Sequence, residues 1–164
     1  MISKILTLFT IGLIILLAVL TVLRLTPLWD RLLKAGDFQP TDFSNLTTPE
    51  TPNWVLICPE NLCQNATRFK IAPVFDMSRD ELAARLKQAV KAEENLEIRH
   101  EDERSLDVVI RTPFMRWPDV VSIEFIEVED GKSTFALFAR AIYGRKDFGV
   151  NKERADKWIN AISE

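Results

Sequence analysis

Residues 119–142 read DVVSIEFIEVEDGKSTFALFARAI, and this stretch decides the fold. Apolar and polar residues alternate within 119–128, which predicts a strand with one solvated face. The core of 133–142 is apolar on both faces, as expected for a central strand. Asp130-Gly131 between the two runs is a strong hairpin signal. The stretch therefore predicts two neighbouring antiparallel strands.

Patterns in the rest of the sequence add further strands and two helices to this hairpin. Further strand-like segments lie at 54–57, 68–75, 96–101 and 105–112, and amphipathic patterns predict helices over 79–93 and 150–162. Ser78 and Glu81 form a capping box at the start of the first of these helices. The order β-β-α-β-β-β-β-α predicts an α+β domain, with an antiparallel sheet and two helices packed on one face.

An uncharged apolar run from Ile5 to Leu23 precedes this domain. As a helix it is roughly 28 Å long, close to a hydrocarbon core of ~30 Å. A buried soluble helix would show a polar stripe, and this run has none. The run exceeds the usual apolar length of a signal peptide, and no A-x-A-like site follows it. The sequence therefore predicts an uncleaved transmembrane anchor at 1–25, in contact with the lipid bilayer through residues 5–23.

The segment between the anchor and the first strand has four prolines and little periodicity. This composition predicts a tether at 26–53, followed by the α+β domain at 54–164. Leu28 to Leu33 has the spacing of a short interfacial helix. Within it, Trp29 would lie either at the headgroup level or against the domain.

Length and charge limit the function classes. The chain has 164 residues, enough for one domain and an anchor. Its formal net charge is −3, and a mildly acidic chain lacks the basic face that nucleic acid requires. We therefore expect no nucleic-acid partner.

Two signals on membrane orientation disagree. Lys4 precedes the apolar run and three basic residues follow it closely, which leans toward a cytoplasmic domain. Cys58 and Cys63, five residues apart with a turn-forming Pro59 between them, could form a disulfide, which persists in oxidising compartments. Two packed free thiols are the other reading. On balance we expect an outward-facing domain.

The sequence offers few residues for metal or cofactor chemistry. His100 is the only histidine and lies in a run of charges, so a solvated strand end is expected there. The spacing of the two cysteines is C-x4-C, which is neither a thiol-oxidoreductase nor a haem-attachment motif. We therefore expect no metal site, no cofactor and no catalytic residue set.

The segment 140–154 has a pattern of its own. Glycines bracket a turn after the last strand, Asp147 can cap or pair locally, Asn151 can cap the final helix, and Arg154 can reach back to Asp147. One reading is a rigid strand–loop–helix corner held by that salt bridge. The other is a basic pocket for an anion or a carboxylate, built from Arg140, Arg145, Lys146 and Arg154.

This segment resembles the end of the domain-of-unknown-function family numbered 1499, in its membrane-anchored alphaproteobacterial type. The residues that carry the resemblance are Arg140, Gly144, Asp147, Gly149, Val150, Asn151 and Arg154, together with Leu25–Pro27, Asn53–Pro59 with Cys63, and Pro113–Asp119. Ala141 stands where the family pattern often has serine. The resemblance implies a single anchored domain in the bacterial envelope and brings no established activity. With the outward-facing domain, it gives a single-pass inner-membrane protein whose domain is periplasmic.

Three functions follow as hypotheses. The first is a non-enzymatic binding or accessory module, such as a subunit of a larger membrane complex, with a membrane protein partner. Its candidate partner-binding residues are Phe114, Arg116, Trp117, Arg140, Tyr143, Arg145, Asp147, Phe148, Asn151 and Arg154. The second is a carrier for a lipid or another apolar small molecule, in a pocket between sheet and helix. The third and most remote is a hydrolase-type enzyme that uses Asp147 or Asp119 with Arg140.

Overall fold

The computed structural model describes residues 2–163 and contains four α-helices, two short 3₁₀ turns and six strands within that range. The elements are α1 (Ile2–Arg24), α2 (Pro27–Leu32), η1 (Phe43–Asn45), β1 (Trp54–Cys58), β2 (Lys70–Ile71), α3 (Arg79–Lys91), β3 (Leu96–Glu101), β4 (Ser105–Arg111), β5 (Pro118–Glu127), η2 (Glu129–Gly131), β6 (Ser133–Ala141) and α4 (Val150–Ser163). The expected α+β class and element order are confirmed.

The six strands form one sheet in the order β2-β1-β6-β5-β4-β3. Its centre is the predicted hairpin, in which β5 and β6 pair from Asp119↔Ala141 to Glu127↔Ser133. Gly131 closes the hairpin with a φ of 72°, a value that glycine adopts without strain. All pairings are antiparallel except that of β1 with β2, which is parallel.

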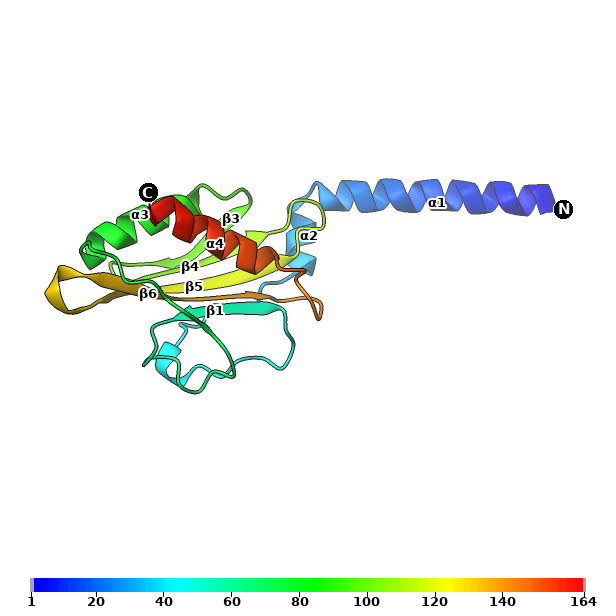
Figure 1. The fold of residues 1–164 in the computed structure, drawn as a ribbon. Helices are drawn as coiled ribbons and strands as arrows, with labels where there is room; N and C mark the ends of the chain where they lie inside the picture. Colours follow the sequence, from blue (N-terminus) through cyan, green and yellow to red (C-terminus); the bar gives the residue numbers. More distant parts are fainter. Residues whose placement is uncertain (1, 164) are drawn as a thin grey trace.

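Helices α3 and α4 lie side by side on one face of the sheet (Figure 1). Ser78 accepts a hydrogen bond from the Glu81 N–H at the start of α3, which is one half of the predicted capping box, whereas the Glu81 carboxylate pairs with Arg85. Leu82 and Leu86 of α3 and Trp158 of α4 are fully buried against the inner residues of the strands. The predicted packing of two helices on one face is therefore observed.

The opposite face of the sheet is covered by loops. Phe43 and the disulfide-bonded Cys58 and Cys63 pack there with Trp54 and Phe138 in a second apolar cluster. Phe43 lies within the segment for which we predict a tether, so part of that segment contributes to the core. The segments that cover this face are irregular because their apolar residues do not repeat with the period of a helix or a strand.

The strand expected over 68–75 is wrong in extent, since only Lys70–Ile71 is a strand. Pro73 has no N–H to donate to a ladder, and its carbonyl accepts from the Thr134 hydroxyl instead. Beyond it, Phe75 makes a single bridge to Ser133. The pairing of β2 ends where its partner β1 ends, at Cys58, whose carbonyl accepts the last bond from the Ala72 N–H.

Helix α1 extends away from the domain and has no buried residue (Figure 1). By length and composition it could cross a membrane, a test that a signal sequence also passes. Its three threonines each donate the side-chain hydroxyl to the carbonyl four residues earlier, so these hydroxyls need no water as a partner. The short helix expected after it is confirmed as α2.

Candidate functional site

The end of α1 is tied to the loop between β4 and β5. The Arg24 guanidinium donates to the Pro113 and Phe114 carbonyls at 2.7 and 2.6 Å. The indole N–H of Trp29, in α2, donates to the Met115 carbonyl at 2.9 Å. The N-terminal helices are therefore fixed to one end of the sheet, and Trp29 contacts the domain.

An ion pair completes this attachment. Arg116 donates to both carboxylate oxygens of Asp30, at 2.6 and 2.5 Å. This hydrogen bond is the main cause that lowers the pKa of Asp30, and the positive charge of Arg111 adds to it. Arg111 also donates to the Leu33 carbonyl at 2.9 Å. We call the Asp30–Arg116 pair with Arg111 the clasp.

The backbone of the β4–β5 loop is shaped to present Arg116. That residue has a φ of 55°, which is uncommon for a side chain of its size. The loop is closed by bonds from the Arg116 and Trp117 N–H groups to the Thr112 carbonyl and hydroxyl, both at 3.0 Å. The loop thus has a defined shape beside the end of α1.

An apolar groove lies between this loop and the loop that joins β6 to α4. Its volume is about 450 Å³. Phe114 and Phe148 are 81% and 87% exposed, and Trp117 is 42% exposed. Both Phe148 and Gly149 have positive φ, at 54° and 86°, which turns the chain sharply at this rim. We call this site the α1-proximal groove and define it by Phe114, Met115, Trp117, Tyr143, Phe148 and Val150.

A buried ion pair lies under the groove. Both guanidinium Nη atoms of Arg154, in α4, are 3.2 Å from the Asp119 carboxylate of β5. The two side chains are only 9% and 4% exposed. Burial raises the pKa of Asp119, and the charge of Arg154 opposes that rise. The pair joins α4 to the central hairpin below the apolar surface.

Asp147 and Asn151 hold the loop that forms the other wall. The Asp147 carboxylate accepts from the backbone N–H groups of Gly149 and Asn151, each at 3.2 Å, so it caps α4. Asn151 lies inside α4, fully buried, and accepts from Arg154 at 2.7 Å. These bonds order the corner of 140–154, but the Asp147–Arg154 salt bridge that was expected to hold it does not form. Asn151 as a cap and Arg154 as the partner of Asp147 are wrong, because Arg154 instead pairs with Asp119.

The candidate residues do not all converge. Phe114, Trp117, Tyr143, Asp147 and Phe148 line one groove. By contrast, Arg116 serves the clasp, and Arg154 and Asn151 lie beneath the surface.

Arg140 lies on the other face of the sheet, with its guanidinium 5.9 Å from the Phe138 ring. A basic pocket of Arg140, Arg145, Lys146 and Arg154 is therefore wrong. The enzyme hypothesis is not supported either, because Arg140 faces away from Asp119 and Asp147.

Several residues of this site are not among the candidate site residues expected from the sequence. Met115 and Val150 line the groove, and Asp30 and Arg24 fix its position. Asp30 and Arg116 are 86 residues apart, and neither lies in a motif that links them. The pairing depends on the docking of α2, which the sequence does not specify.

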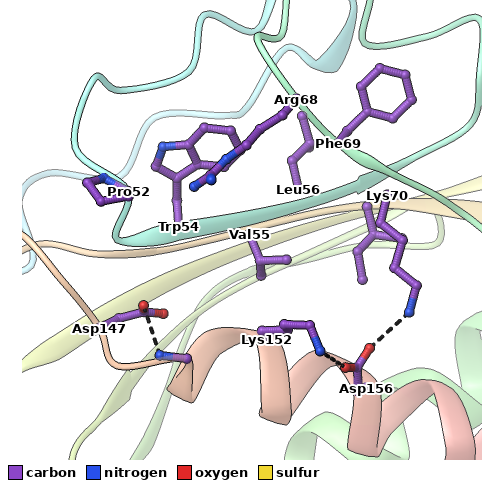
Figure 2. Close-up of a pocket in the computed structure, with 12 residues that line it drawn as sticks. Pro52, Trp54, Val55, Leu56, Arg68, Phe69, Lys70, Asp147, Lys152 and Asp156 are labelled. Carbon is purple, nitrogen blue, oxygen red and sulfur yellow. Dashed lines mark hydrogen bonds and ion pairs between the residues drawn. The ribbon is translucent and has the colours of Figure 1, made fainter.

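A second cleft, of about 400 Å³, follows the outer edge of β1 (Figure 2). Trp54 and Arg68 lie on one side of the strand, and Val55 faces α4 on the other. Lys70 and Lys152 both bond Asp156, at 3.0 and 2.8 Å. Lys70 lies on the edge strand β2, where a charged side chain typically opposes pairing with other chains, and its ion pair with Asp156 joins that edge to α4.

Comparison with known proteins adds one match. A family model described as "Protein of unknown function (DUF1499)" matches residues 45–162, which includes both loops of the groove. A search of curated proteins finds no match to the chain. The matched region begins near η1 and contains the whole sheet.

Proposed function

The chain belongs to the DUF1499 family, and we propose that it is a membrane-anchored, non-enzymatic binding module that engages its partner through the α1-proximal groove. In this proposal α1 remains attached and crosses the bacterial inner membrane, and the domain is periplasmic. The partner is another component of the same membrane. If the partner that occupies the groove is a membrane protein, the chain acts as an accessory subunit of a larger membrane complex.

The observation that carries the proposal is a preformed apolar groove held at the end of the apolar helix. Exposed aromatic residues favour interfaces because they bury a large area with little loss of side-chain freedom. The clasp and the Arg24 bonds fix the groove relative to α1, which reduces the entropy lost on binding. A partner within the same membrane therefore meets a surface that is already oriented.

The alternative of a carrier with a pocket between the sheet and the helices has less support. Leu82, Leu86 and Trp158 are at most 1% exposed, so side chains fill that space. An apolar ligand would find its surface outside the core, in the groove.

Photo-crosslinking in native membranes tests the proposal. A benzophenone side chain replaces Phe148, and the control places it at Val74, an exposed apolar position of the far loop. We expect a discrete adduct at 148 and none at 74. Trp117→Ala should weaken the adduct because it removes one wall of the groove. Phe38→Ala is the control and should leave the adduct unchanged. Phe38 is 38% exposed, close to the value for Trp117, but it stacks on His100 and does not line the groove.

Two results would overturn this function. One is equal labelling at positions 148 and 74, and the other is an adduct at 148 that Trp117→Ala leaves unchanged. The anchor itself is tested by the intact mass of the chain extracted from membranes, which should include α1. A chain beginning after residue 24 would show that α1 is a cleaved signal sequence.

A further inference from the structure

This inference rests on the proposed function and concerns the chemistry of the partner in the α1-proximal groove. Arg24 directly follows the uncharged run that ends at Leu23. An arginine at the end of a span places its guanidinium in the headgroup layer. Because that guanidinium bonds the Pro113 and Phe114 carbonyls, the β4–β5 loop lies at the same level of the bilayer.

The two most exposed aromatic side chains of the domain lie at this level. Phe114 and Phe148 belong to different loops and line the same groove. Their rings would contact water if the domain stood away from the bilayer, and such apolar patches on a soluble surface usually mark an interaction site. At the headgroup boundary the same rings lie beside acyl chains.

The charges beside the groove favour an anion. Arg145 and Lys146 are exposed in the β6–α4 loop, and within residues 2–163 neither makes an ion pair. Asp119 is neutralised by Arg154, whereas the Asp147 carboxylate accepts only from backbone N–H groups of the corner and keeps its charge. A phosphate beside Lys146, which lines the groove, and Arg145, its neighbour in the chain, would therefore meet two cations against one carboxylate.

We propose that the groove takes an acyl chain of an anionic phospholipid from the anchoring membrane, with the lipid phosphate at Arg145 and Lys146. The groove volume of about 450 Å³ falls in the usual range for small-molecule sites. Phe114, Trp117 and Phe148 contact the chain, and the two cations supply the preference for an anionic headgroup. The domain thus contacts the bilayer a second time, beside α1.

Tryptophan quenching by brominated lipid tests this proposal on the full chain. The protein is placed in phosphatidylcholine nanodiscs that contain the same fraction of brominated phosphatidylglycerol or brominated phosphatidylcholine. The difference between the native chain and Trp117→Phe isolates the signal of Trp117 from the other tryptophans. We expect brominated phosphatidylglycerol to quench Trp117 severalfold more strongly, because two cations attract the anionic lipid.

Charge variants identify the headgroup contact. Arg145→Gln with Lys146→Gln should remove the preference for phosphatidylglycerol and leave the weaker quenching by phosphatidylcholine. The control, Arg85→Gln with Lys132→Gln, makes the same charge change in α3 and in the turn of the β5–β6 hairpin, and should keep the preference. Loss of the preference in both double variants would indicate a general charge effect and would overturn the assigned headgroup site.

The outcomes separate this inference from the proposed function. Equal quenching by the two lipids, or no quenching of Trp117, overturns the phospholipid assignment. If position 148 then still crosslinks a protein, the binding function stands with a protein partner. If no adduct forms there either, both proposals fail.

Discussion

Removal of the Asp119 carboxylate should destabilise the domain by more than any single surface change. In Asp119→Ala, the Arg154 guanidinium stays in a site where its side chain is 9% exposed, without its carboxylate partner. Breaking a buried pair in this way costs about 3–5 kcal/mol. Asp119 lines the groove and so lies near solvent, and we therefore expect the lower end, about 3 kcal/mol.

Urea unfolding of the full chain in mild detergent measures this change through tryptophan fluorescence. Trp158, in α4, is 1% exposed and should report the loss of packing. A cost of about 3 kcal/mol corresponds to roughly 10 °C in the melting temperature of a domain of this size. The control Asp156→Ala breaks two exposed ion pairs and should cost less than about 1 kcal/mol.

A double variant tests the cause. Asp119→Ala with Arg154→Met also removes the stranded charge, so it should be more stable than Asp119→Ala alone. A cost below about 1 kcal/mol for Asp119→Ala would contradict the view that Asp119 compensates a buried charge on Arg154. The same view is contradicted if the loss of unfolding free energy in the double variant equals the sum of the losses in the two single variants, since the two side chains would then not interact.

Three further predictions concern other parts of the chain. Asp30→Asn removes the negative charge of the clasp, so the Trp29 emission of the full chain should shift to the red. Because the pKa of Asp30 is lowered, the native chain should show the same shift only as the pH falls below about 4, where the Asp30 carboxylate becomes protonated. Burial raises the pKa of Asp107, so its charge destabilises the fold at neutral pH; Asp107→Asn should raise the melting temperature at pH 7, and the gain should shrink as the pH falls toward the ordinary value of about 4. Reduction of the Cys58–Cys63 disulfide, which closes a short loop, should lower the free energy of unfolding by about 2 kcal/mol, and the variant with both cysteines replaced by serine should show no further effect of reductant.

Local patterns in the sequence predict the centre of the fold well. The β5–β6 hairpin follows from alternation and from Asp130-Gly131, and the start of α3 follows from Ser78. Both signals act within a few residues, where backbone preferences dominate. The short length of β2 has a long-range cause instead, since its pairing stops where β1 ends at Cys58.

The parts that the sequence does not predict depend on long-range contacts. Phe43 is buried because the chain after α2 returns across the sheet, and no periodicity in that segment indicates the path. The partner of Arg154 also depends on a contact between segments that are distant in sequence. Asp147 is nearer in sequence, but it caps α4, and the antiparallel register brings Asp119 beneath the helix instead. Aromatic composition indicated the groove residues, but not the contact with α1 that gives them their position.

The clasp determines what the groove can do. Asp30 and Arg116 do not line the groove, so their loss should leave its apolar walls intact. It would, however, leave the attachment to the Arg24 and Trp29 bonds alone, and an occupant would then have to restrict the added motion between α1 and the domain when it binds. Asp30→Asn should therefore weaken crosslinking at Phe148 without unfolding the domain, whereas Trp117→Ala weakens it by removing contact area. A groove that binds equally well without the clasp would act as an independent surface, and α1 would then serve only to keep the domain at the membrane.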